Sequence, residues 1–127
     1  MAADHIVTVY GTTVLLCAPE GTPITGETSA IDVVGEALGE RVELVAIPVE
    51  RLTDEFFDLS TQIAGEIAQK FANYDVRLAI VGDIADRLQV SDPLAAWVHE
   101  SNAGGQLWFL PTFEDLTERL DRRGKPR

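Results

Sequence analysis

The chain has 127 residues with 46% hydrophobic, 24% charged and 7% aromatic side chains, and its formal net charge is −11. This length suits one domain with a buried core, and the composition excludes disordered, collagen-like and coiled-coil chains. Residues 1–118 carry five basic against 20 acidic side chains, a net charge of −15 that repels phosphate backbones and argues against nucleic acid as a partner.

A hairpin opens the predicted fold. The runs 5–10 and 14–18 are rich in β-branched and apolar residues, as short strands are, and Gly11-Thr12 between them predicts the turn. Two prolines and two glycines within residues 19–26 predict a loop. The first helix is therefore expected after this loop.

The next pattern is helical. Ser29 and Asp32 have the spacing of a capping box, in which the Ser29 hydroxyl would cover a backbone N–H and Asp32 would reach back. Ile31, Val34 and Leu38 follow at helical spacing, and a glycine marks the end. This spacing predicts one apolar stripe along the helix.

From residue 42 onward, apolar strands alternate with helices. The runs 42–47, 76–81 and 106–110 are continuously apolar or nearly so, which is typical of buried strands. Residues 59–74 repeat an apolar side chain every four positions, and Glu66 and Lys70 are expected to pair on the opposite face of that helix.

Two more helices complete the pattern. One is predicted from Ser91, where Asp92 and Pro93 suit a first turn, to a stop at two glycines. The last is predicted from a capping box formed by Thr112 and Asp115.

The predicted order is β-β-α-β-α-β-α-β-α. Apolar strands that alternate with helices form largely parallel sheets covered by helices. We expect a single α/β domain over residues 1–121, with a mixed, mostly parallel five-stranded sheet and about four helices, and a flexible basic tail over residues 122–127. The side chains expected in the core are Val7, Leu15, Val34, Leu44, Ile63, Ile67, Phe71, Ile80, Trp97, Phe109 and Leu116.

The cysteine and histidine content favours a reducing environment without metal. Cys17 is the only cysteine, so it cannot form an internal disulfide, and we expect it to be a small buried hydrophobe in a cytoplasmic protein. His5, His99 and Cys17 lack the spacing of zinc ligands. No apolar run reaches the ~20 residues that span a bilayer. We therefore expect no metal, no cofactor and no membrane as partner.

The middle of the chain resembles a known family. The stretch Phe56-Phe57-Asp58-Leu59-Ser60, with further matches at residues 65–67, 69–74, 78–83 and 100–102, is similar to a family of small bacterial proteins classed as a domain of unknown function, DUF 4180. The resemblance covers roughly residues 25 to 120. The resemblance implies that the protein is bacterial, and it implies no particular biochemical activity.

The order of elements also resembles the STAS fold of anti-sigma factor antagonists. In that family the loop after the third strand carries Asp-Ser-Ser-Gly, whose second serine is phosphorylated, and Asp58-Leu59-Ser60-Thr61 stands at the same place. Residues 107–116 resemble the last strand and the start of the final helix of that fold. The resemblance implies a regulatory, protein-binding role in which Ser60 is the phosphorylation site.

Polar side chains gather where the predicted strands end. In an open parallel sheet, ligands bind beyond the carboxyl ends of the strands. Such side chains could bind an anion at a helix N-terminus, hold a magnesium ion with Asp86, or simply cap helices. The residues expected at this edge are Asp58, Ser60, Thr61 and Asp83, with Glu50, Gly82 and Pro111 beside them.

Three functions follow from these observations. The first is a non-enzymatic, STAS-like regulatory or protein-interaction module that uses the surface around Ser60. The second is a small-molecule or anion-binding protein, or an enzyme, with its site over Asp58, Ser60 and Asp83. The third is a self-associating subunit such as a homodimer, if Trp97 or Trp108 is exposed. We favour the first, because the usual nucleotide-binding and hydrolase motifs are missing from the sequence.

Overall fold

The structure, a computed structural model, describes residues 4–123, with side chains up to residue 121. A five-stranded sheet in the order β1-β2-β3-β4-β5 forms its centre. Strand β1 pairs antiparallel with β2, and the other neighbours are parallel, which confirms the predicted α/β class and the mixed, mostly parallel sheet. The strands are β1 (His5–Val9), β2 (Thr12–Leu16), β3 (Leu44–Pro48), β4 (Arg77–Val81) and β5 (Leu107–Leu110).

Four long helices match the predicted number, and two short helices and two 3-10 turns join them. The long helices are α1 (Glu27–Gly39), α3 (Ile63–Asn73), α5 (Asp92–Ala103) and α6 (Phe113–Arg123). The short elements, which the sequence pattern did not predict, are α2 (Asp54–Phe57), α4 (Ala85–Val90), η1 (Val49–Arg51) and η2 (Leu59–Thr61). Helix α6 extends two residues into the predicted basic tail, and residues 124–127 of that tail lie outside the described part.

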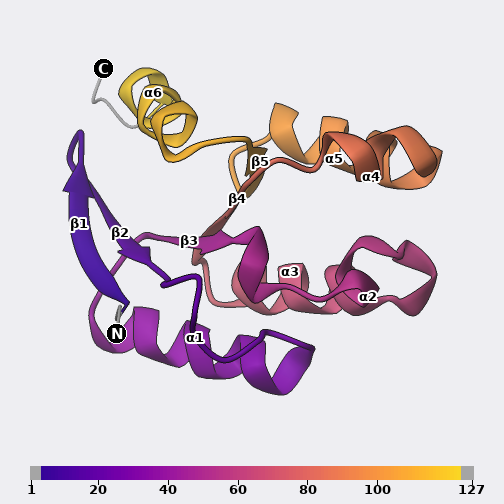
Figure 1. The fold of residues 1–127 in the computed structure, drawn as a ribbon. Coiled ribbons are helices and arrows are strands. Elements are labelled where there is room, and N and C mark those ends of the chain that lie inside the picture. Colours follow the sequence, from indigo (N-terminus) through magenta and orange to yellow (C-terminus); the bar gives the residue numbers. More distant parts are fainter. Residues whose placement is uncertain (1–3, 124–127) are drawn as a thin grey trace.

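The helices cover the two faces of the sheet unequally. Figure 1 shows α1, α3 and α5 on one side and α6 on the other. Crossovers between sequential parallel strands have one hand, so the three connecting helices are placed on the same face. Their apolar side chains form the larger core, whereas Leu116 and Leu120 of α6 pack into a smaller core on the opposite face.

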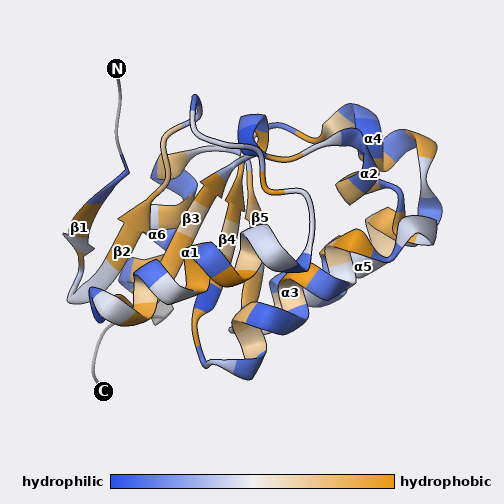
Figure 2. Cartoon of the chain, turned by 90° about the horizontal axis from the view of Figure 1, so that it is seen from below, coloured by the Kyte–Doolittle hydropathy of each residue, from blue (hydrophilic) through white to orange (hydrophobic). Residues whose placement is uncertain are grey.

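The hydropathy pattern explains these layers. Strands β3, β4 and β5 are largely apolar, and α1 and α3 have polar outer stripes (Figure 2). Eight of the eleven expected core side chains are buried. The other three, Val7, Ile63 and Trp97, are half-buried and pack against the core.

The hairpin turn lies one residue earlier than predicted. Tyr10 and Gly11, both with positive φ (49° and 83°), form the turn, and Thr12 is already the first residue of β2. Two consecutive positive φ angles are typical of a type I′ turn, whose twist matches that of the flanking strands.

Helix α1 begins earlier and is rotated relative to the prediction. Gly26 is its N-cap, so Ser29 occupies the third helical position, where its hydroxyl oxygen accepts hydrogen bonds from the N–H groups of Thr25 (2.9 Å) and Gly26 (3.2 Å). Asp32 is not part of this cap. Ile31 and Leu38, which belong to the predicted apolar stripe, are 46% and 47% exposed, whereas the buried side chains are Ala30, Val33, Val34 and Ala37.

The ion pair predicted within α3 is replaced by one between helices. The Lys70 ammonium lies 3.5 Å from a carboxylate oxygen of Glu27 on α1, rather than pairing with Glu66. Helices α1 and α3 are close neighbours, so this long side chain reaches across their interface. Among residues 4–123, no helix has the length and apolar character needed to cross a bilayer.

Candidate functional site

The residues singled out around Ser60 form one compact, exposed turn. A single Asp58 carboxylate oxygen accepts hydrogen bonds from the Ser60 backbone N–H (3.1 Å) and hydroxyl (2.6 Å). The Thr61 hydroxyl lies 2.8 Å from the carbonyl oxygens of both Glu55 and Asp58, which ties the turn to α2. Asp58 thus caps a 3-10 turn, and the Ser60 side chain remains exposed.

Helix α3 starts four residues later than the sequence pattern predicts. Gln62 adopts a left-handed conformation (φ 68°, ψ 1°), which no helical residue can share, so the chain passes through the turn η2 before α3 begins at Ile63. Ser60 therefore lies in the 3-10 turn before the helix and not in the first turn of α3. The repeat of Leu59, Ile63 and Ile67 obscured this break.

Asp83 lies in a different hollow, where β4 and β5 end. The connection of β4 leads to α4 and α5 on one face of the sheet, and that of β5 leads to α6 on the other. Such a divergence opens a crevice that α/β folds use for ligands. Here its volume is about 310 Å³, with Asp83 and Pro111 among its lining residues.

Within this crevice Asp83 has a structural role. Its carboxylate accepts a hydrogen bond from the Ala85 N–H at 2.9 Å, at the start of α4. None of the hydrogen bonds within the described part joins Asp83 to Asp58, Ser60 or Thr61. At Gly82 a Cβ atom would lie 2.4 Å from a methyl group of Val49, so a larger residue would disturb the packing of η1 against β4.

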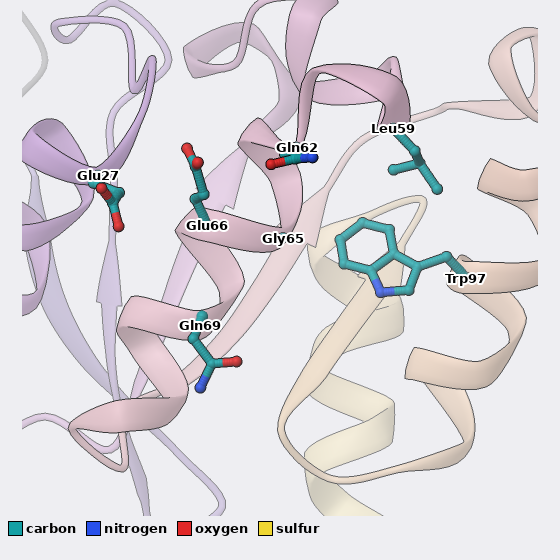
Figure 3. A pocket seen from close by; sticks show the side chains of 7 residues that line it. All are labelled: Glu27, Leu59, Gln62, Gly65, Glu66, Gln69 and Trp97. Atoms are coloured by element: carbon teal, nitrogen blue, oxygen red, sulfur yellow. The ribbon is translucent and has the colours of Figure 1, made fainter.

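A broad hollow among the described residues lies over α3, between α1 and α5, and continues inward between α3 and α5. Its outer part has a volume of about 480 Å³ and is shown in Figure 3, where Leu59 and Trp97 lie on one side of α3 and the carboxylates of Glu27 and Glu66 on the other side, toward α1. A second hollow of about 260 Å³ shares Gly65, Gln69 and Trp97 with it. This inner part reaches the sheet at Leu78 and Leu107. We call the two together the α3–α5 groove.

Small residues make the α3–α5 groove. Gly65, Ala68 and Ala72 lie three and four positions apart on the groove side of α3, so this wall has almost no side-chain volume. On the other wall, the half-buried indole ring of Trp97 packs edge-on against Phe109, with ring centroids 5.4 Å apart. The groove was not predicted, because sequence spacing does not reveal which two helices fail to fill the space between them.

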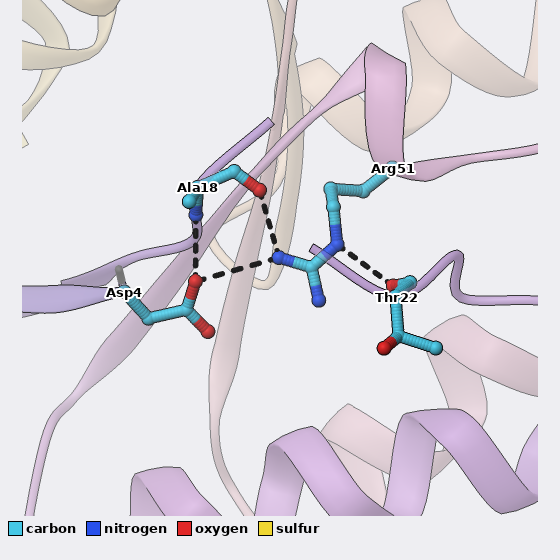
Figure 4. A network of polar contacts seen from close by, with 4 residues as sticks. All are labelled: Asp4, Ala18, Thr22 and Arg51. Atoms are coloured by element: carbon cyan, nitrogen blue, oxygen red, sulfur yellow. Dashed lines mark hydrogen bonds and ion pairs between the residues drawn. The ribbon is translucent and has the colours of Figure 1, made fainter. Parts of the chain in front are cut away.

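A buried arginine at the carboxyl edge was also missed. Arg51, on η1, is 6% exposed and donates hydrogen bonds to the carbonyl oxygens of Thr22 and Ala18, both at 2.8 Å (Figure 4). Its guanidinium lies 3.4 Å from the Asp4 carboxylate, which also accepts from the Ala18 N–H at 2.7 Å. Arg51 thus joins the start of β1, the loop before α1 and the end of β3.

The described residues offer no strong signal of catalysis. Cys17 is buried as predicted, and burial, reinforced by the Asp4 carboxylate, raises the pKa of its thiol to about 12. The thiol is therefore protonated at neutral pH and is a poor nucleophile. In the part of the chain that the structure describes, no three His, Cys, Asp or Glu side chains are grouped as metal ligands would be, and Asp58, Asp83 and Asp86 are no exception.

These features define a small α/β domain with open hollows at the carboxyl edge of its sheet and between its helices. The family model described as "Domain of unknown function (DUF4180)" matches residues 9–120. Since the match spans most of the chain, the protein belongs to this family. The predicted resemblance to this family is confirmed, and the matched region begins earlier than predicted, in the hairpin. No curated protein and no solved structure gives a match.

Proposed function

We propose that this protein is a non-enzymatic interaction module that binds a segment of a partner protein in the α3–α5 groove. The observation that carries the proposal is the open shape of the groove, which runs between two helices down to the sheet. Amphipathic helices dock in grooves of this kind by placing apolar anchors in the floor. The stripe of small residues on α3 would let the backbone of such a segment approach closely.

The side chains around the groove favour an apolar anchor followed by a basic residue. Leu59 and the indole of Trp97 provide an apolar contact at one side of the groove, and aromatic side chains are common anchors in interfaces. On the side of α3 toward α1, Glu27 and Glu66 provide negative charge that is partly offset by Lys70, which pairs with Glu27. The partner chemistry that fits both sides is therefore a cationic amphipathic segment.

Ser60 is suited to regulate this docking. Its exposed hydroxyl lies next to Leu59, at the apolar side of the groove. A phosphate adds about −1.5 to −2 charge, which would require desolvation beside the partner's apolar anchor and would be repelled by Asp58. Phosphorylation would then release the partner. This role agrees with the STAS resemblance, and we extend the proposal to a STAS-like regulator in the bacterial cytoplasm.

The groove can be tested with matched variants of the full chain. Gln69 lines both parts of the groove, whereas Gln89 is exposed on α4 outside it. We expect immobilised wild type and Q89R to capture the same partner from a bacterial lysate, and Q69R and S60D to lose it. S60A should retain it, because the alanine adds no charge.

The captured partner then provides the decisive measurement. Its binding segment, made as a peptide, should bind wild type and Q89R equally and Q69R at least about tenfold more weakly, as expected when a charge blocks an apolar anchor. Equal binding to Q69R and Q89R would show that the groove is not the docking site. Equal binding of S60D and S60A would refute the regulatory role of Ser60 and leave the groove proposal standing.

The crevice between β4 and β5 supports a second candidate function, the binding of a small molecule. The divergence of the two connections at this edge favours it, as does the placement of Asp83 at the rim. A ligand found by screening against wild type should lose affinity in D83N if its polar group meets the carboxylate. Unchanged affinity in D83N would count against a site that includes Asp83.

A further inference from the structure

The face of the sheet that α6 covers carries another hollow. It lies at the carboxyl ends of β2, β3 and β4 and has a volume of about 260 Å³. Its floor includes Leu16 and Ala46, and Phe113 at the start of α6 lines one side. Pro48 and Cys17 also line it, although the Cys17 side chain belongs to the core on the opposite face of the sheet, and we call it the α6-side pocket.

The pocket exists because one helix is too narrow to cover the whole face. Leu116 and Leu120 of α6 are fully buried against Leu44, Ala79 and their neighbours in the middle of the sheet. Nearer the carboxyl edge, Leu16 and Val81 are only half-buried. The small side chain of Ala46 adds depth between them.

The lining is almost entirely apolar. Apart from the imidazole of His5 at one side, the side chains that line the pocket from this face of the sheet offer carbon atoms. A dry apolar cavity of about 150 Å³ already admits benzene, and drug-sized ligands need about 300 Å³ or more. The pocket therefore suits a molecule with one ring or a short alkyl chain.

The lining of the pocket disfavours an anion. No lysine or arginine is among the residues that line it, and the nearby Arg51 is already paired with Asp4. An anionic group that entered this pocket would lose hydration without gaining a lysine or arginine partner from the lining. A neutral molecule avoids this cost.

We propose that the α6-side pocket binds a small, uncharged, apolar molecule. This site lies on the opposite face of the sheet from the α3–α5 groove and is independent of the function proposed for that groove. The pocket would give the carboxyl ends of β2 and β3 a binding role, which the polar residues around Ser60 do not provide.

Titration of the full chain with toluene and 1-hexanol tests the proposal. Backbone amide NMR signals of Leu16, Cys17 and Ala46 should shift in a saturable way. Hexanoate, matched to hexanol in chain length, should bind at least about tenfold more weakly because its charge must be desolvated.

Two variants locate the ligand. A46L fills the floor of the pocket and should abolish the saturable shifts. F113A removes an exposed wall residue, so it should keep the fold and weaken binding about fivefold, the loss expected for part of a ring contact. Y74A, which removes another exposed aromatic side chain on the far side of the molecule, is the matched control and should bind like wild type.

Several results would overturn the proposal. One is the absence of saturable shifts up to the solubility limit of both ligands, and another is equal binding by wild type, F113A and Y74A. If hexanoate binds as tightly as hexanol, the preference for an uncharged ligand is wrong. If the protein instead dimerises and F113A makes it monomeric, a side chain of a second copy fills the pocket.

Discussion

At the scale of single residues, Arg51 has the largest structural role of the charged side chains described above. Removing its guanidinium would leave the Thr22 carbonyl oxygen without this partner, the Ala18 carbonyl oxygen with the Gly21 N–H alone, and the Asp4 carboxylate with the Ala18 N–H alone. Loss of one member of a buried charged network costs ~3 to 5 kcal/mol. We therefore expect R51M to lower the free energy of unfolding by about 3 kcal/mol in urea denaturation.

The same substitution at Arg87 is the control. Its guanidinium lies 2.8 Å from Asp54, but both side chains are largely exposed, and it stacks over the Phe57 ring at 4.3 Å. Exposed ion pairs contribute ~0 to 1 kcal/mol, so R87M should cost less than about 1 kcal/mol. A similar loss in both variants would show that Arg51 does not hold the three segments together.

The role of Arg51 could not be predicted from the sequence. Its partners lie 29, 33 and 47 positions away in the chain, so no local pattern connects them. Cys17, by contrast, was predicted correctly as a buried residue, because a lone cysteine in an apolar run is usually a small hydrophobe.

Cys17 predicts a specific loss of stability at alkaline pH. Burial raises the pKa of its thiol from 9.0 to about 12 in the folded state. Below pH 9 the thiol is protonated in both states, so the group has no effect on stability. Between pH 9 and 12 the unfolded chain releases the proton first, so stability falls as pH rises.

The conversion of ~1.4 kcal/mol per pKa unit sets an upper limit of roughly 4 kcal/mol for this loss at pH 12. Urea unfolding at pH 8, 9, 10 and 11 should show a steeper decline for wild type than for C17A, in which all other titrating groups are kept. Parallel curves for the two proteins would show that the thiol ionises freely in the folded state.

At the scale of elements, the start of α1 depends on Ser29. Its hydroxyl oxygen accepts from two backbone N–H groups that would otherwise lack partners at the helix end. S29A should therefore lower the free energy of unfolding by ~1 kcal/mol, the usual cost of losing such a cap. T28A, an exposed substitution one residue earlier, should change stability by less than ~0.5 kcal/mol. If both variants unfold at the same urea concentration, the hydroxyl of Ser29 does not stabilise α1.

The elements show where local patterns suffice and where packing decides. The α5 cap was predicted, and the Ser91 hydroxyl accepts from the Leu94 N–H at 3.2 Å. Helix α1, however, has two apolar stripes at helical spacing. The stripe with Ala30 and Ala37 faces the sheet, because small side chains allow closer packing, and Ile31 with Leu38 is left outside.

At the scale of the whole molecule, the sheet followed from the sequence because a turn signal separates the first two strands and a helical pattern precedes each of the three later, apolar strands. The positions of the hollows could not be predicted from the sequence in this way. The α3–α5 groove depends on the space between two helices, and the α6-side pocket depends on how far α6 extends over β3. Both hollows form where neighbouring elements leave part of a helix or sheet surface uncovered. The order of residues along one element does not encode how much of that surface is covered.

The charge of the whole molecule leads to the last prediction, that the protein does not bind nucleic acid at physiological salt. The five basic side chains after residue 118 could make weak, salt-sensitive contacts, but the −15 charge of residues 1–118 opposes them. Removing residues 119–127 would be a poor test, because Leu120 of α6 is fully buried against the sheet. Removal of residues 124–127 avoids the buried part of the helix.

Fluorescence anisotropy with a 20-base-pair duplex should therefore give a dissociation constant above about 100 µM at 0.15 M salt, weaker than typical non-specific binding. Binding that appears at low salt should weaken in the shortened chain, because two of the basic side chains are lost with residues 124–127. Micromolar binding at 0.15 M salt that survives the truncation would require a cationic surface on the acidic body of the protein, and would contradict the prediction.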